Sequence, residues 1–247
     1  MRGLDTVRVG AVCRKELLDY RRKRAIVVSM AVLPVVFLIE PIISIFVVPT
    51  AGVDLHHYVI LPLLYMLLVP AVMPATLAAY TVVGEREQGT LEPLLTTPIR
   101  RQELILGKAA AVMLPAVALS YTVFGLFLAA VALFSQAPVS AAVFDQGPVL
   151  LFFFLFAPLV ASWAVVVGMA ISVRASEVRV AQQLGTLASF PPLGVIVLLS
   201  AGVIHPSFTV AVLFCVGLLA LDLLALRLVS GMFDRERLVT GAKAVEA

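Results

Sequence analysis

The stretch AIVVSMAVLPVVFLIEPIISIFVV, residues 25–48, decides the fold class, because it is apolar throughout except for a few polar side chains, of which only Glu40 is charged. About 20 apolar residues are enough for a helix to cross the hydrocarbon core of a membrane. Five further runs of similar length follow, so the predicted spans are residues 25–48, 59–83, 109–134, 148–173, 184–204 and 207–229. The chain is 62% hydrophobic and 13% charged, unlike a soluble domain. We therefore predict an all-α membrane protein with six transmembrane helices.

The positive charges predict how these helices are oriented. All 18 Lys and Arg residues lie in segments that six crossings place on one side of the membrane: residues 1–24, 84–108, 174–183 and 227–247. The loops on the other side, 49–58, 135–147 and 205–206, contain none. Short loops rich in Lys and Arg remain in the cytoplasm, so both chain ends are predicted to be cytoplasmic. Charge confined to such segments forms no basic face for nucleic acid, and we expect no nucleic-acid partner.

Three regions follow from this pattern. Residues 25–229 form the transmembrane domain, and residues 230–247 form a cytoplasmic tail. Residues 1–24 repeat apolar side chains at helical spacing, among them Val7 and Leu18, with basic residues largely elsewhere. That pattern is typical of an amphipathic helix lying in the membrane interface, although a solvated basic tail is the alternative.

The one long polar stretch between spans is GEREQGTLEPLLTTPIRRQELILGK, residues 84–108. A charged group at residues 85–88 precedes Gly89-Thr90, where a short helix can begin with Thr90 as its cap. Pro98 blocks its continuation. The leucines of this short helix can rest on lipid or dock into a groove on a soluble partner.

The same stretch carries a family resemblance. The residues concerned are Glu85, Glu87, Gly89, Thr90, Leu91, Glu92, Leu94, Leu95, Thr97 and Pro98, followed by Arg101 and Gly107-Lys108. In order and in position between the second and third spans, they resemble the signature of type-2 ATP-binding-cassette (ABC) transporter permeases. The outer connection between the fifth and sixth spans is shorter than many members of that family have.

The resemblance implies a mechanism and partners. The loop would contain a coupling helix that fits a cleft of a cytoplasmic ABC ATPase dimer, and residues 1–24 would be the elbow helix. Six spans would be half of the transporter, so a second permease subunit, identical or homologous, is expected. The residues expected to couple to the ATPase are Glu85, Glu87, Gly89, Thr90, Leu91, Glu92, Leu94, Leu95, Pro98 and Arg101. We expect the protein in the cytoplasmic membrane of a prokaryotic cell.

The chain lacks the motifs of a catalytic subunit. It has no phosphate-binding G-x-x-x-x-G-K-[ST] loop, no HExxH, no G-x-S-x-G and no Cys/His cluster. We therefore expect no catalytic residue, no metal and no cofactor in this chain, with ATP and Mg bound by the partner ATPase.

Four residues inside the spans are candidates for the translocation path. Glu40 and Asp222 are intramembrane carboxylates, which are costly and usually face protein or water. Asp222 can instead bond to a hydroxyl or to Arg227. Pro191 and Pro192 interrupt the fifth span and free backbone carbonyls there.

Other features leave alternatives open. Phe152, Phe153, Phe154 and Phe156 indicate an aromatic belt at the outer interface, or a surface for a hydrophobic substrate. The leading functional hypothesis is an exporter of small ions, drugs or lipid-like molecules. An ion-coupled secondary transporter that uses Glu40 and Asp222 is the second, and a membrane scaffold without transport is the third.

Overall fold

The computed structural model describes residues 5–22, 24–48, 52, 54–89 and 99–232, and every regular element in that part is helical. Six helical segments are long and apolar enough to cross a membrane. The prediction of an all-α protein with six spans is therefore confirmed. The predicted short helix after Thr90 and the tail from residue 233 lie outside the described residues.

Several spans are built from more than one helical piece. The elements in chain order are α1 (Thr6–Arg22), α2 (Arg24–Val47), α3 (Leu55–Tyr58), α4 (Ile60–Tyr65), α5 (Leu68–Ala79), the π-helical turn η1 (Tyr80–Gly84), α6 (Glu85–Glu87), α8 (Arg101–Phe134), α9 (Ala137–Phe144), α10 (Gly147–Arg174), α11 (Val178–Ser189), the 3₁₀ turn η2 (Pro191–Leu193), α12 (Gly194–Ser200) and α13 (Phe208–Met232). The predicted loop 135–147 thus contains a helix of its own, and residues 201–207 join the last two spans.

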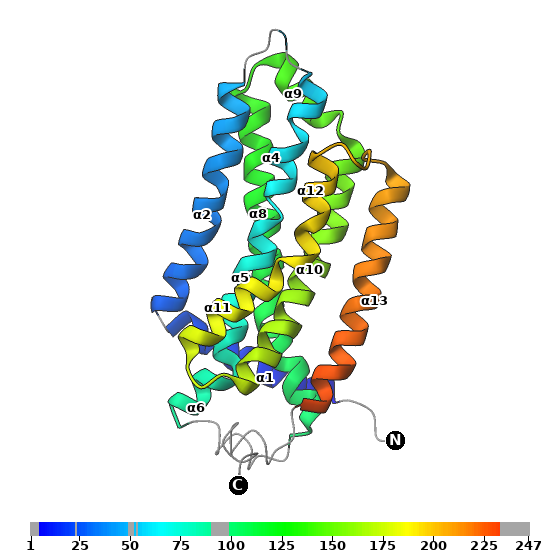
Figure 1. Cartoon of the computed structure of the whole chain (residues 1–247). Helices are drawn as coiled ribbons and strands as arrows, with labels where there is room; N and C mark the ends of the chain where they lie inside the picture. Colours follow the sequence, from blue (N-terminus) through cyan, green and yellow to red (C-terminus); the bar gives the residue numbers. More distant parts are fainter. Residues whose placement is uncertain (1–4, 23, 49–51, 53, 90–98, 233–247) are drawn as a thin grey trace.

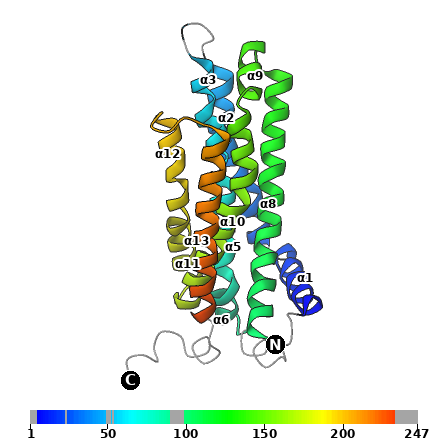
Figure 2. The ribbon, with the colours of Figure 1, turned by 90° about the vertical axis from the view of Figure 1, so that its right-hand side faces the viewer.

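The helices form an elongated bundle with distinct ends (Figure 1). Helices α3 and α9 lie at one end, and α1 and α6 lie at the other. Helices α2 and α13 stand on opposite sides of the bundle in Figure 1, and in Figure 2 α13 lies in front and α2 behind. Helix α10 lies between them, in contact with α5, α8, α11 and α13.

Two prolines free backbone carbonyls that aromatic side chains then satisfy. Pro158 has no N–H for the carbonyl of Phe154, and the hydroxyl of Tyr121 donates to that oxygen at 2.7 Å. Pro192 likewise leaves the carbonyl of Ala188 without its helical donor, and Trp163 Nε1 donates to it at 3.0 Å. In a lipid environment such replacement bonds are needed, because water cannot supply them.

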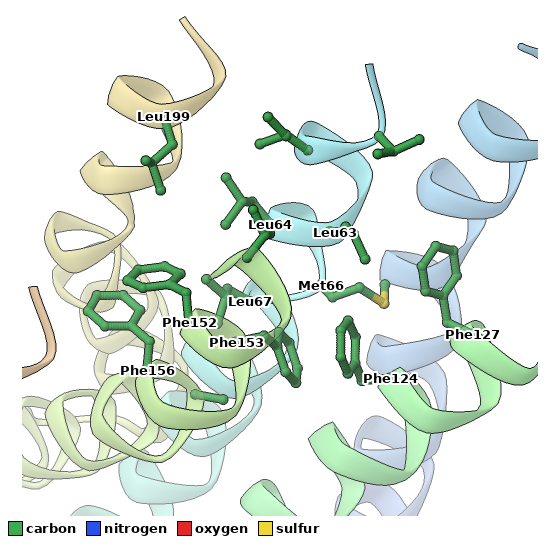
Figure 3. Packing of buried hydrophobic residues seen from close by; sticks show 14 of the residues in the cluster. Leu63, Leu64, Met66, Leu67, Phe124, Phe127, Phe152, Phe153, Phe156 and Leu199 are labelled. Carbon is green, nitrogen blue, oxygen red and sulfur yellow. The ribbon is translucent and has the colours of Figure 1, made fainter. Parts of the chain in front are cut away.

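The phenylalanines of α10 form the core, and only Phe154 among them is exposed. Phe153 stacks on Phe124 of α8 with ring centroids 3.7 Å apart, and Phe152 stacks on Phe156 at 4.5 Å (Figure 3). The prediction of an aromatic belt is therefore wrong for Phe152, Phe153 and Phe156. The reason is that α10 is surrounded by other helices, so its side chains meet protein on most sides.

Small residues allow α5, α10 and α11 to approach closely. A Cβ atom at Gly168 of α10 would lie 2.7 Å from the Cβ of Ala78 on α5. A Cβ at Gly185 of α11 would lie 3.6 Å from the carbonyl oxygen of Ala75. Close backbone contact at small residues is a main source of helix association in membranes.

We expect Gly168→Ala to weaken this packing, because the new methyl group has no space beside Ala78. Overpacking of this kind typically costs about 1–3 kcal/mol, seen as a lower midpoint of thermal unfolding in detergent. Gly125→Ala on α8 is the matched control, since a Cβ there meets nothing within 4 Å. Equal midpoints for the two variants would contradict the proposed contact.

Candidate functional site

Helix α6 is a single charged turn at the end of the second span, and it contacts several other helices through its side chains. Its first residue, Glu85, is buried, whereas Glu87 is exposed. Gly89 follows with a φ of +66°, a left-handed conformation that glycine adopts without strain and that commonly ends a helix. The turn therefore projects from η1 as a compact charged knob.

Lys108 of α8 lies at the centre of a buried ionic cluster, which we define as Glu16, Glu85, Lys15 and Lys108. Its ammonium is 2.8 Å from Glu85 Oε1 and 3.0 Å from Glu16 Oε1. It also donates to the carbonyl oxygen of Thr81 at 2.8 Å. The Lys108 side chain is only 1% exposed. A buried ammonium is costly unless its protons are bonded, and here each of them has an acceptor.

Lys15 extends this cluster toward the surface. Its ammonium is 3.2 Å from both Glu16 Oε1 and Glu85 Oε1, and its side chain is about half exposed. Burial alone would raise the pKa of Glu16, but the charges and hydrogen bonds of Lys108 and Lys15 outweigh it and hold that pKa below its usual value. Partial burial opposes the charged form of Lys15, yet Glu16 and Glu85 raise the pKa of its ammonium overall.

Arg86 and Glu87 connect α6 to α10 and α11. The guanidinium of Arg86 donates to the carbonyl oxygens of Val173 and Ala175 at the end of α10, at 3.0 and 3.1 Å. Glu87 Oε1 accepts from the backbone N–H of Val178, the first residue of α11, at 3.0 Å. A cation at a helix C-terminus and an anion at a helix N-terminus are both favourable there.

The base of α8 is fastened to α1. A Cβ at Gly107 would lie 2.6 Å from the Cβ of Val12 and 3.0 Å from the carbonyl oxygen of Val9, so glycine permits this close approach. The buried carboxylate of Glu103 accepts from the backbone N–H groups of Asp5 and Arg100 at 3.2 and 3.0 Å. Together with the ionic cluster, α6 thus joins the second span to α1, α8, α10 and α11.

This arrangement is suited to transmitting force and contains no feature of a metal site. In the described part of the chain, no three His, Cys, Asp or Glu side chains are grouped so that they could hold a metal ion. A small charged turn bonded to four other helices, α1, α8, α10 and α11, can move them together when it is displaced. A comparison with protein-family models matches residues 10–221 to the ABC-2 family of transporter proteins. The chain belongs to the ABC-2 family. No curated protein matches it.

In this ABC-2 family chain, two of the signature glutamates have internal partners. Glu85 lies in the ionic cluster, and Glu87 caps α11. Arg101 is the first residue of α8. The predicted coupling residues between them lie outside the described residues: Thr90, Leu91, Glu92, Leu94, Leu95 and Pro98. Contact of any of these residues with an ATPase stays a prediction.

The two intramembrane carboxylates of this family member lie far apart. Glu40 is on α2, where its Oε1 accepts from the hydroxyl of Ser44 at 2.6 Å. Asp222 on α13 is 2% exposed and faces Ser162 of α10, but neither of its oxygens has a hydrogen bond of good geometry within the described residues. Because α2 and α13 stand on opposite sides of the bundle, one chain does not bring the two carboxylates together (Figure 1).

A groove of about 980 Å³ opens between α2, α5 and α11. Its apolar lining comes from α2 and α11, and its polar lining from Thr76 of α5 and from α11. Pro191 and Pro192 form the turn that follows α11, whereas Asp222 does not line the groove. The lining residues are Val28, Val32, Leu33, Thr76, Gln182, Gln183, Thr186 and Leu187.

Sequence reasoning missed the roles of Glu16 and Lys108 in the ABC-2 chain. Lys108 was assigned to a polar loop, and Glu16 was one of several charges on an amphipathic helix. One local signal existed: Val12, Glu16 and Tyr20 recur every four residues, and these three form the buried face of α1. A carboxylate within a buried stripe requires a cation, but periodicity does not say which one.

We expect Lys108→Met to destabilise the fold strongly, because it leaves Glu16 and Glu85 buried with half-exposed Lys15 as the one remaining ammonium of the cluster. Breaking a buried pair typically costs about 3–5 kcal/mol. Lys15→Met is the matched control in the same cluster, and loss of a half-exposed pair should cost less than about 1 kcal/mol. Thermal unfolding of both variants in detergent measures the difference. A Lys108→Met protein as stable as Lys15→Met would contradict the assignment of Lys108 as the central cation.

Proposed function

We propose that this chain is the non-catalytic permease subunit of an ABC exporter, driven by ATP hydrolysis in a separate ATPase. Membership of the ABC-2 family and the six apolar helices support a permease. The observation that carries the proposal is the bracing of α6, because the loop that would meet an ATPase begins at this turn. A force applied to the loop would reach four other helices, α1, α8, α10 and α11, through bonds of 2.8 to 3.2 Å.

The distribution of charge supports an orientation with α1 and α6 in the cytoplasm. Among the described residues, α1, α6, the start of α8 and the junction between α10 and α11 carry Lys and Arg at that end, whereas α3 and α9 at the other end carry none. Helix α1 would then be the elbow helix. Its side chains Val7, Ala11 and Leu18 are exposed on a face turned away from the bundle, where they can contact lipid.

The bracing suggests a division of labour within loop 84–108. Glu85, Arg86 and Glu87 hold the loop to its own bundle, so they are occupied by internal partners. The apolar residues Leu91, Leu94 and Leu95 are then the candidates for docking into a cleft of the ATPase. ATP and Mg would be bound by that ATPase dimer, and a second permease subunit would complete the transporter.

The groove between α2, α5 and α11 is our candidate for this subunit's part of the translocation path. Its lining is apolar or neutral and polar, with no charged side chain. Such a surface suits drugs and hydrophobic or lipid-like molecules better than small ions, because an ion needs charged or numerous polar partners. The separation of Glu40 from Asp222 gives an ion-coupled carrier less support than ATP-driven export.

The docking proposal is tested with Leu94→Ala. We expect about tenfold weaker binding to the partner ABC ATPase, identified first by co-purification with the wild-type chain, the effect of removing one apolar anchor. Leu126→Ala is the matched control, since Leu126 lies on the exposed, lipid-facing surface of α8. Binding is measured by co-purification and titration in nanodiscs. If the ATPase does not bind the wild-type chain, a membrane scaffold or a secondary carrier becomes the better reading.

The path proposal is tested with Gln183→Leu in proteoliposomes that contain the ATPase. We expect ATP-driven transport of a fluorescent phosphatidylcholine or of ethidium to fall about threefold to tenfold, as for loss of one hydrogen bond to the cargo. Asp222→Asn, away from the groove, should retain transport of both probes. Loss of ethidium transport in Asp222→Asn alone would instead assign the path to Asp222, and transport that survives without ATPase would exclude the ATP-driven mechanism.

A further inference from the structure

We propose that the π-helical turn η1 is a hinge in the second span, and that Ser172 and Lys108 are the positioning residues that hold it. The inference rests on the proposed function, because a hinge needs the ATPase to move it. It goes beyond that function by naming where the movement enters the membrane part and which side chains control it.

The backbone of η1 is held by side chains from two other spans. The hydroxyl of Ser172 on α10 donates to the carbonyl oxygen of Ala79 at 2.7 Å. It accepts from the N–H groups of Val82 and Val83 at 3.2 and 3.1 Å. From α8, Lys108 binds the carbonyl oxygen of Thr81. A π turn contains one residue more than an α-helical turn, so its backbone groups are displaced from their usual partners, and here side chains replace them.

The positions of Ser172 and Lys108 make the geometry of η1 dependent on both α10 and α8. Ser172 is fully buried and Lys108 nearly so, and water therefore does not compete for these bonds. Gly84 ends the π turn in close contact with Tyr80, because a Cβ atom at Gly84 would lie 3.1 Å from Cδ1 of Tyr80. If the hydrogen bonds from Ser172 and Lys108 to the backbone break, the turn can change from π-helical to α-helical geometry.

This change of geometry would rotate and shift the neighbouring part of the second span, although only a few hydrogen bonds would break. Taking up one extra residue into an α-helix corresponds to a rotation of about 100° and a rise of about 1.5 Å. Thr76 lies one turn before η1 and lines the groove, opposite Gln183 of α11. A change in η1 would thus alter the groove directly.

Lys108 connects this hinge to the loop that the ATPase would move. The same ammonium binds Glu85 on α6 and the Thr81 carbonyl inside η1. Displacement of α6 would move Glu85, and the Lys108 ammonium bound to it, away from Thr81. The hydrogen bond from Lys108 to the Thr81 carbonyl would weaken, and Ser172 would be left as the main contact that holds η1. The path from loop to groove is therefore continuous through α6, Lys108, η1 and Thr76, and η1 is the element that would change between two arrangements along it.

Hydrogen exchange of the complete chain in nanodiscs tests the hinge without knowledge of the cargo. The measurement follows the peptide covering residues 79–88, with and without the co-purified partner ATPase and Mg–ATP. In the wild type we expect exchange of this peptide to become about 3- to 10-fold faster during ATP turnover, the factor for losing one net hydrogen bond. In Ser172→Ala we expect that faster exchange already without ATP, and little further change when ATP is added.

Two variants separate positioning from stability alone. Ser120→Ala is the matched control, because Ser120 is equally buried but its hydroxyl bonds only to Ala116 in its own helix. It should keep the wild-type exchange and its response to ATP. Ser172→Thr retains the hydroxyl and should restore the response that Ser172→Ala loses. In all three variants, ATPase binding should stay within about twofold of wild type, since none of them changes a docking residue.

The outcomes distinguish the hinge from the proposed function. If the ATPase binds and hydrolyses ATP but exchange of residues 79–88 does not respond, the hinge is wrong and the permease function stands. If Ser172→Ala responds to ATP as the wild type does, Ser172 is only structural and the proposal is also wrong. If the ATPase does not bind the wild-type chain, both proposals fall together.

Discussion

The buried ammonium of Lys108 is the interaction on which the α1 end of the bundle depends. A charge that is 1% exposed can remain there only with its three protons bonded, and the acceptors come from three different segments: Glu16 on α1, Glu85 on α6 and the Thr81 carbonyl in η1. Each acceptor fixes the position of its own segment relative to α8. Helix α1 is thereby joined to the bundle, and the start of loop 84–108 is joined to the second and third spans.

The rest of the bundle follows a second constraint, which is that backbone groups freed by prolines or by irregular geometry find side-chain partners in place of water. Tyr121 and Trp163 bond to carbonyls freed by prolines, and Ser172 bonds to amides displaced by the π turn. Helix contact is obtained by small residues such as Gly168 and Gly185, because burial of apolar surface gives little advantage when the outside is also apolar. The irregular backbone of η1 lies where other helices cover it, whereas in η2 only Leu193 is buried.

The signature between the second and third spans acquires a physical meaning from these contacts. One junction contains the signature residues Glu85, Glu87, Gly107 and Lys108. Glu85 binds Lys108, Glu87 binds the start of α11, and Gly107 leaves space for the close approach of α1. The ABC-2 family relationship was predictable from the order of these residues, but their roles were not. From sequence, Glu85 and Glu87 are predicted to contact the ATPase; in the structure Glu85 is buried against Lys108, and Glu87, although exposed, binds the start of α11. Their pattern in sequence is the same in both cases.

The sequence by itself determined the features that depend only on the order of residues along the chain. Run length predicts six helices, since the thickness of the membrane sets a minimum length for each. The Lys and Arg pattern predicts an orientation, and Pro191-Pro192 predicts the break in the fifth span that η2 confirms. Only the tertiary structure decided that Glu16 meets Lys108 across 92 residues and that Ser172 clamps η1 across 90. It also placed Phe152, Phe153 and Phe156 in the core instead of an interfacial belt. In a chain that is apolar on nearly every helix face, hydrophobic periodicity does not distinguish lipid from protein, so which faces meet is decided by packing and by the few polar groups that must find one another.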